Sequence, residues 1–258
     1  MFQSFFKRLR ALFQSSPKRV PFKPEWESYL VENLPIYSKL PDQHKASLRN
    51  QVSEFIPRVY WEGVNGLELT EEMIVSVASQ ACLLTLNMRG NPYARLKTVI
   101  LFPKVFNHEG TSVDAGGTYT ESRHKVAGLS YGRGTVSLAW SQTEYGARFM
   151  NDGVNVVFHE FAHQLDQADG YANGAPILRR PEHYKEWCSV MEKAYAKLVD
   201  ASERGKVSLL DHYGATNPAE FFAVATETFF EKPRKMYKRF PDLYEIMEQY
   251  YQLDPKAW

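Results

Sequence analysis

The sequence has 258 residues, of which 44% are hydrophobic and 24% are charged, and its formal net charge is +1. These values are typical of a soluble globular protein and exclude a disordered or low-complexity chain. The near-zero charge argues against direct nucleic-acid binding, which would need a strongly basic surface. No apolar run approaches the length of a membrane span. Two cysteines without CxxC spacing, Cys82 and Cys188, favour a reducing compartment, so we expect a cytoplasmic protein.

Residues 1–20 form a basic amphipathic N-terminal arm. It carries five basic side chains and no acidic one, and its apolar residues recur at helical spacing from Phe2 to Phe13. Two interpretations stay open. The arm lies on an anionic membrane surface or in a partner's groove as a short helix, or it packs on its own domain or stays partly disordered. Residues 21–258 are expected to form a single domain.

The first part of that domain predicts helices. Two are expected between Pro24 and Arg58, with a break at Pro35. The cluster Trp61–Gly66 is typical of a turn. A helix start signal at Thr70 precedes an almost wholly apolar run, Met73–Leu86, which predicts a buried central helix.

The middle of the chain contains the predicted strands. Thr98–Phe102 and Thr135–Trp140 are rich in β-branched and aromatic residues, and the Gly-, Ser- and Thr-rich stretch 107–134 between them predicts turns and hairpins. The fold class is therefore a helix-dominated α+β chain with one small central sheet. Four further helices are predicted at about 149–168, 181–200, 217–231 and 236–250.

The segment His159-Glu160-Phe161-Ala162-His163 carries the clearest chemical signal. On a helix, the two histidines lie about 40° apart and one turn along the axis, so both can reach one zinc ion at about 2.0–2.1 Å. Glu160 lies about 100° round from His159, which suits a general base better than a ligand. The alternative is a pair of half-buried histidines with ordinary hydrogen-bond partners. The apolar residues around them favour the zinc site.

A peptidase zinc ion needs a third protein ligand. An apolar helix opened by Asn217-Pro218 contains two carboxylates, Glu220 and Glu227, which share a face. They are about two turns apart, so they cannot be equivalent ligands of one ion. Spacing favours Glu220 as the ligand and Glu227 as an outer residue or salt-bridge partner, but it leaves the reverse order open.

Two further polar residues are candidates with simpler structural alternatives. Asp166 shares a helix face with His163, so it either orients an imidazole from outside the metal's ligand sphere or is a surface acid. Tyr213 lies in a turn-like segment before Glu220, where a phenol can donate to a developing oxyanion. Spacing alone favours a packed surface tyrosine at this position.

The strings HEFAHQLD and YGATNPAEFFAVATETFF resemble the Mlc titration factor A family, zinc metallopeptidases of the gluzincin type. The second string is also similar to the catalytic domain of lethal-factor toxins. The resemblance spans about residues 58–254, so it leaves the N-terminal arm outside it. What it implies for the site is one zinc ion per chain held by His159, His163 and Glu220, Glu160 as the general base, and Tyr213 as an aid at the transition state.

The resemblance also implies a zincin-like peptidase fold for residues 21–258, aminopeptidase activity on peptides in the cytoplasm, and binding of the repressor Mlc. Two functions of different classes follow. The first is a zinc peptidase whose substrate pairs as an added strand with the strand near Val136–Trp140. The second is a non-catalytic protein that binds and sequesters a transcription factor. Glu160 favours the enzyme, because a protein that merely binds needs no general base.

Overall fold

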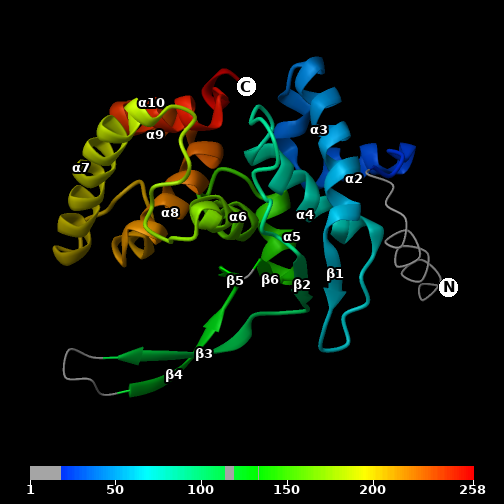
Figure 1. The fold of residues 1–258 in the computed structure, drawn as a ribbon, viewed down its shortest axis with the longest axis horizontal. Coiled ribbons are helices and arrows are strands. Elements are labelled where there is room, and N and C mark those ends of the chain that lie inside the picture. Colours follow the sequence, from blue (N-terminus) through cyan, green and yellow to red (C-terminus); the bar gives the residue numbers. More distant parts are fainter. Residues whose placement is uncertain (1–18, 114–118, 133) are drawn as a thin grey trace.

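The computed structural model describes residues 19–113, 119–132 and 134–258. The predicted N-terminal arm, residues 1–20, lies outside the described residues apart from its last two. In the described ranges, helices dominate and a small mixed sheet lies along one side of the helical body (Figure 1), which confirms the predicted α+β class. No helix in these ranges is long and apolar enough to cross a membrane.

The first described elements are helical, as predicted. Prolines stand at the first helical positions of these elements, where a fixed φ and a missing backbone donor are tolerated, so proline separates one helix from the next. The only longer helix here without such a start follows Pro41, which precedes its first residue. The elements are α2 (Pro24–Asn33), η1 (Pro35–Lys39), α3 (Asp42–Phe55) and η2 (Ile56–Arg58).

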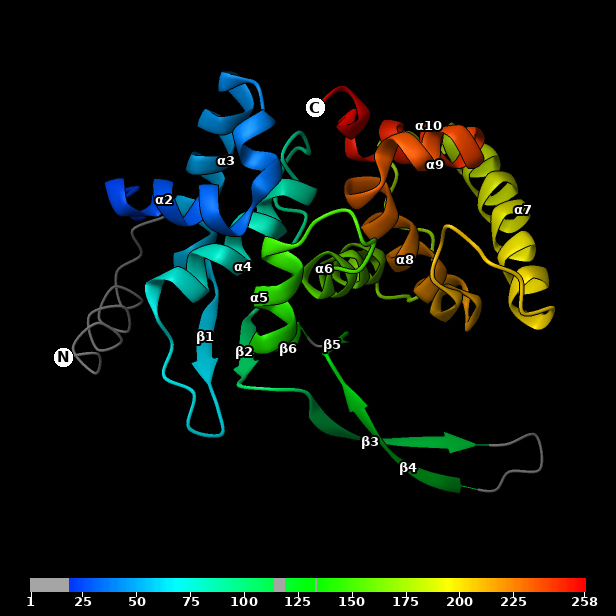
Figure 2. The ribbon, with the colours of Figure 1, turned by 180° about the vertical axis from the view of Figure 1, so that it is seen from behind.

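The next helix, α4 (Glu71–Leu84), is the central helix predicted from the apolar run. The Thr70 side chain caps it by accepting the Met73 backbone N–H at 3.2 Å. Every residue from Ile74 to Leu84 is buried, as a helix that is apolar all round requires. It packs against α6 (Val156–Asp166), which lies at the centre of the molecule between α4 and α8 (Pro218–Glu231) (Figures 1 and 2).

Within the described residues, four strands form the main sheet in the order β1-β2-β6-β5. The two predicted strands are confirmed as β2 (Thr98–Phe102) and β6 (Thr135–Ala139), which run parallel. β6 also pairs with β5 (Gly128–Tyr131), which is antiparallel to it. The expectation that a substrate pairs with the strand near Val136–Trp140 is therefore wrong, because neighbouring strands already occupy both sides of β6.

β1 (Tyr60–Gly63) occupies residues that were partly predicted as a turn. It runs parallel to β2, with Tyr60 opposite Thr98. The predicted turn is present just after it, where Asn65 and Gly66 have φ of 54° and 81°. A strand this short has too few residues for an alternating pattern, and its partner lies far along the chain, so local sequence does not reveal it.

A second, two-stranded sheet lies in the stretch predicted as turns and hairpins. β3 (Phe106–Val113) and β4 (Tyr119–Val126) pair antiparallel and project from the body of the molecule (Figures 1 and 2). The described chain thus has two small sheets where one was predicted. Ala127 alone separates β4 from β5, so the hairpin leads directly into the main sheet.

The last part of the chain returns to helix, with two differences from the prediction. α5 (Trp140–Arg148) begins where a strand was expected to end, and α6 begins at Val156 instead of near residue 149. The delay has a local cause, because Asn151 and Gly153 have φ of 86° and 83° and make a left-handed turn before the helix. The remaining elements are η3 (Gln167–Asp169), η4 (Pro181–His183), α7 (Tyr184–Glu203), η5 (His212–Ala215), α9 (Pro233–Arg239), α10 (Pro241–Tyr251) and η6 (Pro255–Ala257).

Candidate metal centre

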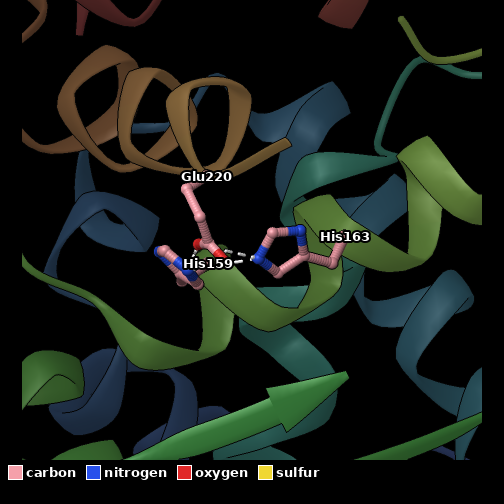
Figure 3. A group of neighbouring side chains, drawn as sticks. All are labelled: His159, His163 and Glu220. Atoms are coloured by element: carbon pink, nitrogen blue, oxygen red, sulfur yellow. Dashed lines mark hydrogen bonds and ion pairs between the residues drawn. The ribbon is translucent and has the colours of Figure 1, made fainter. Parts of the chain in front are cut away.

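Three of the predicted site residues converge on one point. His159 and His163 extend from α6, and Glu220 extends toward them from the first turn of α8 (Figure 3). Oε2 of Glu220 lies 2.9 Å from Nε2 of His159 and 3.2 Å from Nε2 of His163. The two Nε2 atoms are 3.2 Å apart.

The two helices are each started by an asparagine. Oδ1 of Asn155 accepts the backbone N–H groups of Val157 and Phe158 at 3.1 and 3.0 Å, which fixes the start of α6 just before His159. Oδ1 of Asn217 accepts the N–H of Glu220 itself at 3.0 Å. The caps therefore fix the helix starts next to His159 and Glu220, and His163 follows one turn after His159 on α6, against a buried core.

The donor set fits a metal ion. Ligands at about 2.0–2.1 Å from a tetrahedral zinc ion are about 3.3 Å from one another, close to the separations of these three atoms. Two imidazole nitrogens and one carboxylate oxygen are also ligands that zinc prefers. His159, His163 and Glu220 form a group in which all three donor atoms lie within 4.8 Å of one another.

The charges at this point favour a cation. Burial opposes protonation of His159, but Glu227 and Glu220 outweigh it and raise the pKa of this imidazole well above its usual value. Burial likewise opposes ionisation of Glu220, but His159 and His163 outweigh it and lower the pKa of the carboxyl to about 2. The carboxylates therefore stabilise positive charge between these side chains, whether it comes from a proton or from a metal ion.

Glu227 contacts the other side of the same imidazole. Its Oε2 lies 3.0 Å from Nδ1 of His159, and its Oε1 accepts the Asn155 backbone N–H at 2.7 Å. A carboxylate on Nδ1 holds the ring in the tautomer and orientation that leave Nε2 for a metal. Glu227 thus hydrogen-bonds both Asn155, which caps α6, and the imidazole of His159, and it is not one of the three converging donors.

Asp166 lies at the end of α6 and is fully buried. Its Oδ2 accepts the backbone N–H of Gly174 at 3.0 Å, so it holds the loop that follows α6. Burial raises the pKa of Asp166, while the Gly174 N–H and the nearby His163 oppose that shift. In the described part of the chain, its hydrogen bonds go to backbone and not to an imidazole.

Glu160 is buried beneath β5. Burial raises its pKa to about 7, although the nearby histidines oppose that shift. Gly128 of β5 makes this approach possible, because a Cβ there would lie 2.5 Å from Oε1 of Glu160 and 2.7 Å from Cγ2 of Val156. Sequence reasoning missed Gly128. Gly128 is the first residue of β5 and lies in a Gly-, Ser- and Thr-rich stretch that predicted turns, so no local signal distinguished it from the other glycines there.

Tyr213 lies on η5, across the cleft from β5. Its backbone N–H donates to Oδ1 of Asp211 at 2.7 Å, and its ring centroid is 5.8 Å from that of His159. Partial burial, with the nearby charges of Glu220 and Glu160, raises the pKa of Tyr213 to about 12. The residue is 56% exposed, and its raised pKa keeps the hydroxyl protonated at neutral pH.

A cleft of about 340 Å³ connects these groups. It is lined by His159, Glu160 and Tyr213 together with Gly128 of β5. Within the described sheet, β5 is an outer strand, with β6 on one side. The arrangement combines a candidate metal point, a buried carboxylate, a protonated phenol and the end strand of a sheet, which are the parts needed to hydrolyse a polar bond in an extended chain.

Comparisons with known proteins agree with this chemistry. The profile of the glucose-regulated metallo-peptidase M90 family matches residues 7–252, which also brings most of the N-terminal arm within the family match. An uncharacterized protein of Synechocystis is 38% identical over 96% of this chain and 89% of its own length. Proteins named Mlc titration factor A are 29% identical in Klebsiella pneumoniae, over 90% of this chain and 87% of theirs, and 27% identical in Pectobacterium atrosepticum, over 95% and 92%.

Proposed function

The chain belongs to the glucose-regulated M90 family of metallopeptidases, and on that premise we propose that it is a zinc-dependent aminopeptidase. The observation that carries the proposal is the convergence of His159, His163 and Glu220, with Glu160 beside them in the same cleft. Three protein ligands are typical of catalytic zinc sites, whereas structural sites have four.

The proposed chemistry assigns a role to each group. One zinc ion per chain would supply a Lewis acid for the scissile carbonyl and lower the pKa of the attacking water. The Glu160 carboxylate would accept a proton from that water and return it to the leaving amine. The Tyr213 hydroxyl would donate to the carbonyl oxygen as negative charge develops there.

The substrate is proposed to lie along β5. An extended peptide can add to the outer strand of a sheet through backbone hydrogen bonds, which provide affinity with little dependence on sequence. Gly128 lines the cleft next to Glu160, so a peptide on this strand would present a bond to the buried carboxylate.

Preference for a free amino terminus is the finer part of the proposal. It is supported by the resemblance of the chain to the Mlc titration factor A family.

Two measurements test the enzyme proposal. Metal analysis of the purified protein should find one zinc ion per chain, and aminoacyl p-nitroanilides should be hydrolysed faster than the same substrates with an acetylated amino terminus. Removal of zinc by a chelator should abolish hydrolysis of both kinds of substrate, and added zinc should restore it. Hydrolysis that continues at an unchanged rate without metal would overturn the proposal.

A regulatory role is the second proposed function. The name of these relatives, Mlc titration factor A, supports Mlc as the proposed partner. The family resemblance implies that Mlc is a transcriptional repressor and that the two proteins meet in the cytoplasm. Binding should be separable from catalysis, because a substitution of Glu160 removes a general base without changing the outer surface. Pull-down of Mlc by both wild type and Glu160→Gln supports this role. Failure of both to bind Mlc contradicts it and leaves the peptidase proposal standing.

A further inference from the structure

A second cavity, of about 360 Å³, lies at the C-terminal end of α6. Its lining shares no residue with the cleft that holds the candidate metal centre. The walls come from the segment between α4 and β2, the end of α6, the loop before α7 and the end of α10. We call it the arginine pocket, because Arg89, Arg95 and Arg179 line it.

The arginine pocket is positively charged. Neither aspartate nor glutamate belongs to its lining, and in the described part of the chain none of its three guanidinium groups forms an ion pair. Arg179 makes a neutral contact, a hydrogen bond to Oε1 of Gln252 at 3.3 Å. Elsewhere on this protein exposed arginines do have carboxylate partners, as Arg204 has in Asp200 at 2.7 Å. Three cations around one cavity without a counter-charge favour an anionic occupant.

The inner part of the pocket is apolar and held in place. Leu165, Tyr93 and Tyr250 line it. The Tyr93 hydroxyl donates to the Ala81 carbonyl oxygen at 2.9 Å, and its ring packs edge-on against Phe161 at 5.2 Å between centroids. Tyr93 is only 7% exposed, so it forms part of a fixed apolar floor, and the half-buried Tyr250 is the more accessible ring. Apolar walls with a few polar groups at one side are typical of small-molecule sites of this volume.

One wall is fixed by an unusual backbone. Gln252 ends α10 with φ of 54° and ψ of 36°, a left-handed conformation that side chains other than glycine seldom adopt. Its carbonyl oxygen accepts the Asn87 side-chain amide at 2.7 Å, while its own side chain accepts from Arg179. Strained residues persist where the surroundings hold them and are common at ligand sites. Gln252 thus joins the end of α10 to two other walls of the pocket.

We propose that the arginine pocket binds a small organic anion, a phosphate or carboxylate group on an aromatic or apolar body. The planar guanidinium groups match the paired oxygens of either anion. The half-buried ring of Tyr250 and the apolar floor around it take the body. This site is independent of the proposed peptidase activity, because it uses none of the residues in the metal cleft.

Three naphthalenes that share one body test the proposal. 1-Naphthyl phosphate, 1-naphthoate and neutral 1-naphthol are titrated into the zinc-loaded full chain by calorimetry. We expect at least one anion to bind with one-to-one stoichiometry and about 10-fold or more tighter than 1-naphthol, with weaker binding at higher salt. Comparison of the affinities for 1-naphthyl phosphate and 1-naphthoate identifies the preferred anion. Equal binding of 1-naphthol, or no binding of any of the three, would overturn the proposal.

Substitutions then locate the site. Arg89→Gln, Arg95→Gln and Arg179→Gln should each weaken binding of the preferred anion by about 10-fold, the loss expected for one charge-assisted hydrogen bond. Arg204→Gln is the matched control, because that arginine is exposed just after the end of α7 and does not line the pocket, so it should leave binding unchanged. Circular dichroism checks that each variant is folded. Anion binding that survives all three pocket substitutions, or that depends on zinc instead, places the ligand elsewhere and refutes the proposal.

Discussion

The two sides of the metal cleft are built in different ways. On the helix side, α6 and α8 are capped by Asn155 and Asn217, and they place the converging side chains against a buried core. On the strand side, β5 is a four-residue outer strand whose closest approach to the site depends on a missing side chain, at Gly128. The helix side depends on side chains that are present, whereas the strand side depends on the absence of a side chain at Gly128, which leaves room for Glu160.

This difference predicts different kinds of failure. Removal of one of the proposed ligands from the helix side should cause the metal itself to be lost. A side chain added on the strand side should leave the metal in place and disturb the position of Glu160 or of the substrate. The comparison is therefore testable by substitutions that separate metal content from turnover.

The largest effect is expected for Glu220→Ala. It removes one of the three converging donors, so zinc affinity should fall by more than about 100-fold, since changes outside the ligand sphere already cost about 10–100-fold. Glu227→Ala is the matched control on the same helix, because it removes the support of His159 and should cost only about 10–100-fold. Competition with a chromophoric chelator measures both. If Glu227→Ala empties the site while Glu220→Ala does not, the ligand assignment is reversed.

Glu160→Gln, a substitution on the helix side, should lower the rate of hydrolysis without changing the zinc content. Glutamine keeps the size of the side chain but cannot accept the proton, so hydrolysis should fall by about 10²–10⁴-fold while zinc stays at one per chain. Metal analysis and initial rates on one aminoacyl substrate check the two halves. A variant that hydrolyses peptides at the wild-type rate would remove Glu160 from the mechanism.

Gly128→Ala tests the strand side. The new methyl group would lie 2.5 Å from Oε1 of Glu160, so either β5 or the carboxylate must move. Displacement of a reacting group by about 1 Å can cost about 10²-fold, so we expect kcat to fall by about 10–100-fold with zinc retained. Gly132→Ala is the control, because its nearest neighbour, Oε1 of Gln167, is 4.0 Å away. Loss of zinc in Gly128→Ala would show that the two sides are not separable.

The smallest expected effect is on the pH dependence of thermal stability, and it arises at Glu231, the last residue of α8. Burial raises the pKa of this carboxyl to about 8, against the opposing hydrogen bonds from Asn151 and Asn155. Between its ordinary pKa of 4.5 and about 8, the folded protein holds a proton that the unfolded chain releases, so stability falls as pH rises through this window.

Glu231→Gln removes that dependence, because the amide imitates the protonated acid at every pH. We expect the Tm of the variant to match that of wild type near pH 5 and to exceed it by at least about 2–4 °C at pH 8.5, the shift that 1 kcal/mol causes in a chain of this size. Thermal unfolding at the two pH values measures it. A difference that is the same at both pH values would contradict the buried, protonated state.

Long periodic segments were the part of the fold that sequence predicted well. The central helix after Thr70 and the helix after Asn217 appear close to their predicted bounds, because a cap and an apolar run are local properties. β1 and the delayed start of α6 were missed. β1 depends on pairing with a distant strand, and the start of α6 depends on the left-handed turn at Asn151 and Gly153.

The sequence by itself determined the chemistry available to this protein. The spacing of His159 and His163 on one helix makes two nitrogens converge, and an apolar helix with Glu220 and Glu227 must find partners for both carboxylates. Only the tertiary structure decided which carboxylate faces both Nε2 atoms, and that β5 is the strand at the cleft. Those facts depend on how α6, α8 and the sheet lie relative to one another. Packing and long-range strand pairing set that placement, and no local pattern of residues encodes it.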